Sequence, residues 1–366
     1  MGLLKNLFGK KEEPIASYAD FWNWFQKNEK GLRKAVKTGN NIETDFFEVL
    51  APKLDELREG FQFVTGMEDD DTVRLIFTAD GVIKNIVFVE ELVEAAPPLD
   101  GWIFIAHKPE RDLLNIKIVM EEYEFREDNL HFFSNDHDDL PDEIDITVVH
   151  DDYTEENKEA IEHGINLFLD NYLGELNFAT IIDNISVVSK DEATKELVSI
   201  EKLKSFLIWR QKEFIEKYDS TQHNSENDDF AGLEATKDDK PLLAVINTTL
   251  LDWDRKASHP WITIIEIKYD GTDNDGMPDE ETYALLDEIE NKIVSELSEA
   301  EGHLNIGRET CDNTQEIYFA CKDFRKPSLV LPELLHQYSD KFELDFTIYK
   351  DKYWQSFSRF SNIELE

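Results

Sequence analysis

Basic residues are scarce in this chain of 366 residues. Only 38 lysines and arginines stand against 80 aspartates and glutamates, and the formal net charge is −42. Binding to nucleic acid requires lysine and arginine to neutralise phosphates, so the composition argues against direct binding of DNA or RNA. Three interpretations of the charge remain: a solubilising surface, attraction of a basic protein partner, or mimicry of nucleic acid. The even spread of the acidic residues favours the first interpretation.

Cysteine is rarer still, with only Cys311 and Cys321 in the chain. The turn residues 312–314 place them on the two arms of one hairpin, out of register for a disulfide. We therefore expect reduced thiols and a cytoplasmic protein. The sequence shows no signal peptide and no apolar run long enough to cross a membrane. Residues 1–11 have the pattern of a short basic amphipathic helix, which leaves a membrane-surface tether open beside a loose tail.

Catalytic motifs are absent as well. The sequence contains no G-x-S-x-G elbow, no Walker sequence, no phosphate-binding glycine loop and no cysteine–histidine dyad spacing. Pairs of carboxylates carry no information, because about one residue in five is acidic and such pairs arise by chance. We expect no cofactor, and binding rather than catalysis.

Aromatic residues are plentiful, with 24 phenylalanines and 7 tryptophans, which is enough for two buried cores. We predict an α+β protein of two domains. A tail of residues 1–16 precedes an α+β domain of residues 17–218 with a mostly antiparallel sheet. An acidic polar linker follows at residues 219–240, and a second domain fills residues 241–366.

The first domain shows alternating helical and strand patterns. Helices are predicted over residues 17–38, 43–58, 86–95, 154–173 and 200–218. Strands are predicted over residues 61–66, 72–78, 102–106, 114–119, 130–133, 144–149 and 178–189.

The second domain has the order strand, helix, strand, strand, helix, strand between residues 261 and 349, after a first strand at 242–247. The helices are predicted over residues 278–300 and 328–338, with a hairpin over 303–321 between them. This order predicts a ferredoxin-like βαββαβ sandwich.

Two aspartates, Asp273 and Asp275, are the candidates for a metal site. They match the third and fifth ligand positions of an EF-hand loop whose glycine is Gly276. The first ligand position is Gly271 and the twelfth is Thr282, so two essential carboxylates are missing. An acidic turn before a helix N-terminus is the competing interpretation, and the missing ligands favour it.

Two further residues are candidates for an interaction surface. Trp253 lies in the polar segment 251–255. It is interpreted either as an exposed aromatic contact for a partner or as a residue of the core. Arg308 follows Gly307 in a strand, where binding of an anion competes with a structural salt bridge, and the salt bridge is the more frequent outcome.

Short motifs in the second domain resemble the DUF695 family of uncharacterised bacterial proteins, over roughly residues 240–357. The resemblance is carried by His259-Pro260-Trp261, Asp275-Gly276-Met277-Pro278, Ile306-Gly307-Arg308-Glu309-Thr310 before Ile317-Tyr318-Phe319, and Tyr353-Trp354. It implies no established activity. Some members are joined to a domain resembling the RraB regulators, which inhibit ribonuclease E. The first domain is similar to other bacterial proteins of unknown function.

From these observations we expect a strongly acidic, non-catalytic regulatory protein of the inhibitor or immunity type, with a protein partner that carries basic charge. Two alternatives stay open. One is a hydrolytic enzyme with an unrecognised site, and the other is a membrane-surface scaffold tethered by residues 1–11.

Overall fold

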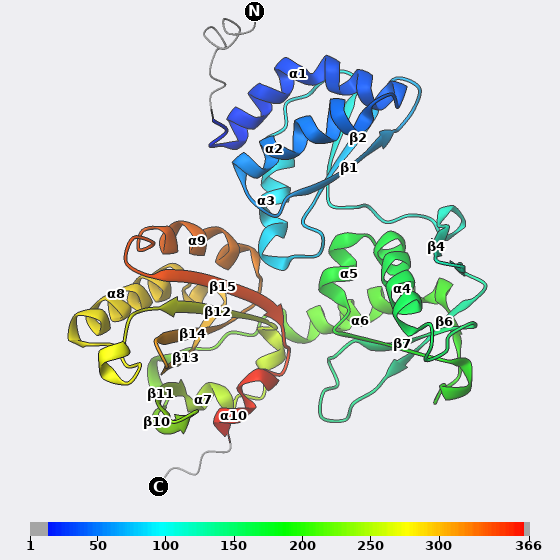
Figure 1. The fold of residues 1–366 in the computed structure, drawn as a ribbon. Coiled ribbons are helices and arrows are strands. Elements are labelled where there is room, and N and C mark those ends of the chain that lie inside the picture. Colours follow the sequence, from blue (N-terminus) through cyan, green and yellow to red (C-terminus); the bar gives the residue numbers. More distant parts are fainter. Residues whose placement is uncertain (1–13, 362–366) are drawn as a thin grey trace, which may run out of the picture. The chain divides into compact units, whose positions relative to one another are not determined.

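The computed structural model describes residues 14–361 of the chain, which form an α+β fold with several sheets (Figure 1). The predicted tail of residues 1–16 and the predicted tether of residues 1–11 lie largely or wholly outside this range. Two compact units are present, Met1–Pro109 and Glu110–Glu366. Each unit is described by itself.

The first unit packs three helices and a π-helical turn against a small sheet. Its helices are α1 (Tyr18–Thr38), α2 (Glu48–Leu57) after the turn Glu43–Phe47, and α3 (Ile83–Glu94). Its strands are β1 (Gln62–Met67), β2 (Val73–Thr78) and β3 (Trp102–Ala106), in the order β1-β2-β3 with β2 and β3 parallel. Ser17 caps α1 by accepting a hydrogen bond from Asp20 N, as its sequence predicts. The predicted elements of this region are confirmed.

The second unit begins with two small sheets and three helices. The strands are β4 (Ile118–Met120), β5 (Tyr123–Phe125), β6 (Leu130–Asn135), β7 (Asp145–His150), β8 (Asn184–Val188) and β9 (Val198–Ser199). The helices are α4 (Lys158–Leu173), α5 (Glu175–Ile181) and α6 (Leu203–Tyr218). The four-stranded sheet has the order β8-β7-β6-β9, in which β7 and β8 are parallel.

Residues 17–218 therefore differ from the prediction of one sheet, although most of their strand pairs are antiparallel, as predicted. Their strands form three separate sheets, and two of the strand pairs are parallel. The strand predicted over residues 178–189 is also too long, because its first four residues complete α5. That segment is apolar and short, and periodicity alone does not distinguish a buried strand from a buried helix there.

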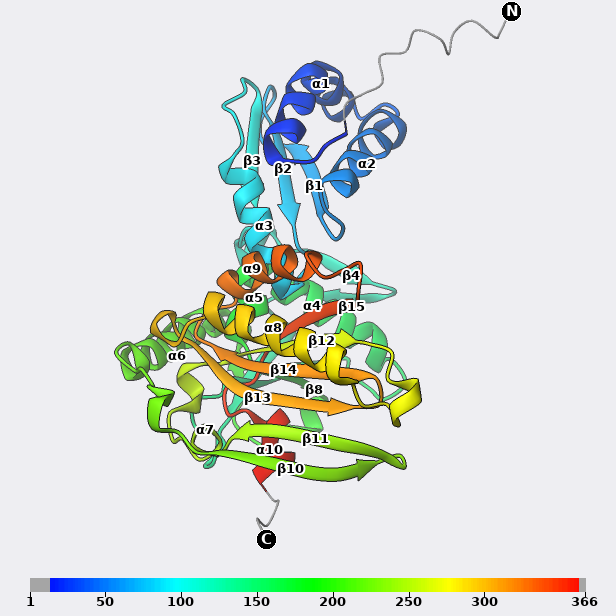
Figure 2. The same ribbon diagram turned by 90° about the vertical axis from the view of Figure 1, so that its left-hand side faces the viewer.

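The second unit ends in a six-stranded antiparallel sheet of order β10-β11-β13-β14-β12-β15. Its strands are β10 (Phe230–Lys237), β11 (Lys240–Asn247), β12 (Trp261–Lys268), β13 (His303–Cys311), β14 (Thr314–Cys321) and β15 (Glu343–Lys350). Helices α8 (Glu280–Glu296) and α9 (Arg325–His336) lie on one face (Figures 1 and 2). Part of the other face is buried under α7 (Thr248–Leu251), Trp354, Phe357 and α10 (Ser358–Ser361).

Strand β10 occupies the segment that the sequence predicts to be a linker. Only Leu233 of this edge strand is buried. An exposed edge strand can have the same polar, acidic composition as a linker. Composition alone therefore does not distinguish an edge strand from a linker. The division by contacts falls at residue 109 instead, and residues 219–240 lie inside the second unit.

Two carboxylates of the earlier part of this unit bind the last residue of β15 and the segment that follows it. Asp183 forms ion pairs with Lys350 at 2.7 Å and with Lys352 at 2.6 Å, and the Lys352 side chain is only 1% exposed. Asp142 accepts a hydrogen bond from the Tyr353 hydroxyl at 2.7 Å. These bonds hold the six-stranded sheet to the four-stranded part of the same unit.

Candidate functional site

A row of carboxylates crosses the face of the six-stranded sheet that lies opposite α8 and α9. Glu266 of β12 pairs in register with Glu316 of β14, and Glu316 pairs with Glu309 of β13. On the other side, Glu266 pairs with Asp345 of β15. Residues in register on neighbouring strands point to the same face and lie close together. We call Glu266, Glu309, Glu316 and Asp345 the acidic row.

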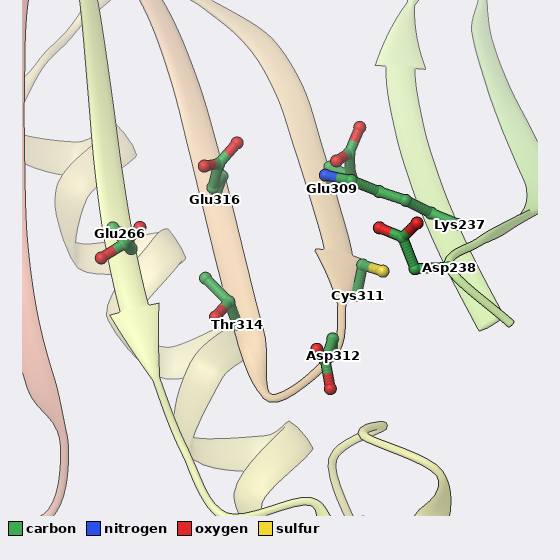
Figure 3. A pocket seen from close by; sticks show the side chains of 8 residues that line it. All are labelled: Lys237, Asp238, Glu266, Glu309, Cys311, Asp312, Thr314 and Glu316. Atoms are coloured by element: carbon green, nitrogen blue, oxygen red, sulfur yellow. The ribbon is translucent and has the colours of Figure 1, made fainter. Parts of the chain in front are cut away.

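A hollow of about 250 Å³ lies over this part of the sheet. Figure 3 shows Glu266, Glu316 and Glu309 on three neighbouring strands, with Lys237 and Asp238 at the turn of the β10–β11 hairpin. The lining contains five carboxylates and one lysine, together with Thr314 and Cys311. The hollow is therefore strongly negative.

Neighbouring groups compensate part of this charge. The Tyr318 hydroxyl donates to Glu316 at 2.6 Å and accepts from Arg359 at 2.9 Å, and Arg359 also pairs with Glu309 at 3.3 Å. Lys268 lies 3.3 Å from Glu266. Burial, together with the charge of Glu316, raises the pKa of Tyr318, so this tyrosine stays a neutral donor.

The acidic row costs the fold some stability. Like charges directly opposite each other on paired strands are unfavourable. Each such pair costs about 0.2–1 kcal/mol of stability, the magnitude by which favourable cross-strand pairs stabilise a sheet. Two such pairs lie within the hollow, Glu266 with Glu316 and Glu316 with Glu309. An added positive group would relieve this repulsion, so the arrangement is suited to binding a basic side chain.

The turn between β13 and β14 sets the register of the row. Asp312 and Asn313 both have positive φ, 43° and 66°, as in a type I′ hairpin turn. With these two residues at the turn, Glu309 and Glu316 are in register. Sequence reasoning located the turn but missed the row. The signal in the sequence that could have indicated the row is a glutamate three residues from the turn on each arm of the hairpin.

Arg308, a predicted interaction residue, points to the opposite face of the sheet, toward α8. It forms a salt bridge with Glu290 and lies 3.7 Å from Asp287. Its guanidinium also donates to the Tyr283 hydroxyl at 3.2 Å. The structure therefore uses Arg308 in a salt bridge between β13 and α8, and does not bring it to the acidic row.

Trp253, the other predicted interaction residue, is half-buried. Its ring lies 5.1 Å from that of His223, 5.5 Å from that of His259 and 6.2 Å from that of Trp354. The structure therefore places Trp253 in an aromatic cluster at the edge of the core, away from Arg308 and the acidic row.

Asp273 and Asp275 lie in the exposed turn between β12 and α8. Asp275 adopts a left-handed conformation with φ 54°. The neighbouring Asp279 caps α8 by accepting a hydrogen bond from Thr282 N at 2.8 Å. Residues 14–361 contain no group of three or more histidine, cysteine, aspartate or glutamate side chains placed to hold a metal ion.

One serine–histidine contact has the atoms of a catalytic dyad. Ser258 Oγ lies 2.8 Å from His259 Nδ1, but the hydroxyl also donates to Arg255 O at 2.7 Å. Ser258 is 6% exposed and His259 is 1% exposed, and burial lowers the pKa of His259 to about 3. This pair is closed to substrates. Both cysteines are free thiols, and burial raises the pKa of Cys321 to about 12.

Comparison with known proteins identifies one part of the chain. Residues 233–361 match the DUF695 family, a family of unknown function. The match confirms the resemblance seen in the sequence and covers the six-stranded sheet from within β10 to the end of α10. No curated protein and no solved structure gives a significant match. Among the described residues, no helix combines the length and apolarity needed to span a bilayer.

Proposed function

We propose that the protein is a non-catalytic regulator of the inhibitor or immunity type, which binds a basic protein partner at the acidic row. One observation supports this proposal above the others. Three glutamates of the row stand side by side over a hollow with a single lysine in its lining, although their mutual repulsion costs stability. A partner's lysine or arginine would relieve that repulsion.

The expected contribution of the charges is larger for the rate of association than for affinity. Exposed ion pairs each contribute about 0.2–1 kcal/mol. A field from a net charge of −42 steers a basic partner from a distance. Salt screens such a field beyond about 8–10 Å at physiological ionic strength, so the complex should weaken as salt rises.

An affinity pull-down from host lysate tests the proposal. The tagged chain is compared with the double variant Glu266→Gln/Glu316→Gln at low and high salt. The control is Asp191→Asn/Glu196→Gln, which removes two exposed carboxylates elsewhere in the second unit. We expect the native chain and the control variant to capture one basic protein at low salt. This protein should not be captured at high salt, and the double variant should not capture it at either salt concentration. Equal capture by all three chains would contradict the proposal.

Two finer assignments belong to the same proposal. First, β12, α8, β13, β14, α9 and β15 form a ferredoxin-like core, which the β10–β11 hairpin extends. The strand order β13-β14-β12-β15 with every pair antiparallel supports this. Second, the protein acts in the cytoplasm, which its free thiols support. The competing alternative, a membrane-surface scaffold tethered by residues 1–11, predicts instead liposome binding that is lost when those residues are deleted.

A further inference from the structure

A second cavity lies on the face of the sheet that carries α8. It occupies about 510 Å³ between α8 and the strands β11 and β13, which is within the range of small-molecule sites. The apolar part of its wall is formed by Phe230, Val245, Val294, Leu297 and Phe319. We call this cavity the α8 groove.

The apolar wall is open to solvent in part. Phe230 is 54% exposed, Val245 40% and Val294 42%. Val245 and Phe230 belong to the β10–β11 hairpin, which adds two strands to the sheet beyond β13. Helix α8 contributes Val294 from the other side, so the two walls face each other across an accessible space.

The floor of the groove is polar, and two of its buried atoms have no hydrogen-bond partner within the described part of the chain. His303 and Asn305 lie two residues apart on β13 and therefore point to the same face. His303 is only 3% exposed, and its Nδ1 atom has no hydrogen-bond partner among residues 14–361. The buried Oδ1 atom of Asn305 has none either. A buried polar atom without a partner is unfavourable, so this floor is suited to a ligand that supplies hydrogen bonds.

A β-bulge next to Asn305 shapes the groove. The register of β13 against β14 shifts between Asn305 and Gly307, and bulges commonly reorient side chains at binding sites. Gly307 has φ 138°, and a Cβ atom there would lie 2.1 Å from Val245 O. Glycine is therefore required where the two strands approach, and the bulge brings Arg308 to the face of β13 on which His303 and Asn305 already lie.

The charges of the groove select against anions. Arg308 is neutralised by Glu290 and Asp287. Glu299, a second acidic residue of the lining, accepts a hydrogen bond from Ser225. Burial lowers the pKa of His303 to about 4, so its ring is neutral near pH 7. The lining thus offers hydrogen-bond acceptors and no uncompensated cation.

We propose that the α8 groove binds a small uncharged molecule with an apolar body and a carboxamide group. The amide N–H groups donate to Asn305 Oδ1 and to His303 Nδ1, with His303 protonated at Nε2. The apolar body lies between Val245 and Val294. This site is on the opposite face of the sheet from the acidic row and does not depend on the proposed function.

A matched pair of probes tests the site in the full chain. Indole-3-acetamide and indole-3-acetate share the same indole body, and they differ in that only the acetamide side chain is uncharged and carries N–H donors. Binding is read from the ring signals of His303 by nuclear magnetic resonance, which the variant His303→Gln identifies. We expect millimolar binding of the amide and at least about tenfold weaker binding of the acid, since two net hydrogen bonds and the charge distinguish them.

Variants on exposed positions separate binding from folding. Val294→Arg places a long side chain in the groove and should abolish binding of the amide. Ile208→Arg, at an α6 position that is 61% exposed and outside the groove lining, should leave it unchanged. Circular dichroism should show the native melting temperature for both variants. Absence of amide binding, equal binding of both probes, or unchanged binding to a folded Val294→Arg chain would each overturn the proposal.

Discussion

Removal of the Asp183 carboxylate should strongly destabilise the second unit. The Asp183 side chain is 8% exposed and pairs with two lysines, Lys350 and Lys352, whose side chains are 13% and 1% exposed. Asp183 Oδ2 also accepts a hydrogen bond from Ile144 N at 2.6 Å. The variant Asp183→Ala leaves both ammonium groups without their carboxylate. Loss of one partner from a buried ion pair costs about 3–5 kcal/mol.

A matched control isolates the effect of burial. Asp136 pairs with Lys195 at 2.7 Å, the same distance as Asp183 with Lys350, but the Asp136 side chain is 84% exposed. Such exposed pairs contribute about 0–1 kcal/mol, so Asp136→Ala should have little effect. A third variant, Asp183→Leu/Lys350→Met/Lys352→Met, replaces the buried charges by apolar groups and should recover much of the lost stability.

The assay is urea unfolding followed by circular dichroism, with hydrogen exchange of peptides from β15 as a local measurement. Asp183→Ala should lower the free energy of unfolding of the second unit by about 3–5 kcal/mol and speed exchange in β15, which precedes Lys352. If Asp183→Ala were no more destabilising than Asp136→Ala, the buried ion pairs would not hold the six-stranded sheet to the four-stranded part of this unit.

Three further predictions follow from the packing and the titrating groups. Gly164→Ala should cost about 1–3 kcal/mol in urea unfolding, because a Cβ at Gly164 would lie 2.0 Å from the buried Phe125 ring; an unchanged midpoint would contradict this. Burial lowers the pKa of His259 to about 3 and that of His303 to about 4. Only the unfolded chain therefore takes up these protons as pH falls below about 6.5, and stability should drop by about 2 kcal/mol per histidine between pH 7 and pH 5. The variant His303→Gln should show a smaller drop, and a pH-independent midpoint would refute the assignment. Asp279→Ala should cost about 0.5–2 kcal/mol through loss of the α8 cap, whereas Asp273→Ala should cost little, as thermal unfolding will show.

Local signals in the sequence predict most elements of this fold. The cap at Ser17, the apolar spacing of α8 and the turn at Asp312 and Asn313 each depend on residues close together in the chain. For this reason the elements of the first unit and the order of β12 to β15 agree with prediction. A two-residue turn fixes the register of its two strands. The pairing of Glu309 with Glu316 could therefore have been predicted from the position of the turn.

The features that escaped prediction depend on contacts between distant residues. The position of β10 at an exposed sheet edge and the boundary at residue 109 are set by which segments pack together, and composition carries little information about that. Glu266 joins the acidic row only because β12 pairs with β14, although α8 and β13 lie between these two strands in the sequence. Likewise, the α8 groove exists because Val294 and Val245, which are far apart in the sequence, face each other.

The acidic row makes a testable connection between stability and function. The variant Glu266→Gln/Glu316→Gln removes three in-register pairs of like charges, while the new amide oxygen at position 316 would still accept the hydrogen bond from Tyr318. We therefore expect a chain at least as stable as the native one in urea unfolding, with weaker binding. A destabilised variant would mean that the row supports the fold.

The rate of association with the captured partner tests the central claim most directly. Stopped-flow fluorescence would follow the native chain, Glu266→Gln/Glu316→Gln and the control Asp191→Asn/Glu196→Gln at low and high salt. We predict that the native and control rates are alike and fall about tenfold or more as salt rises, and that the row variant is slower and less sensitive to salt. If the row variant and the control associated equally fast at every salt concentration, the acidic row would not be the binding surface.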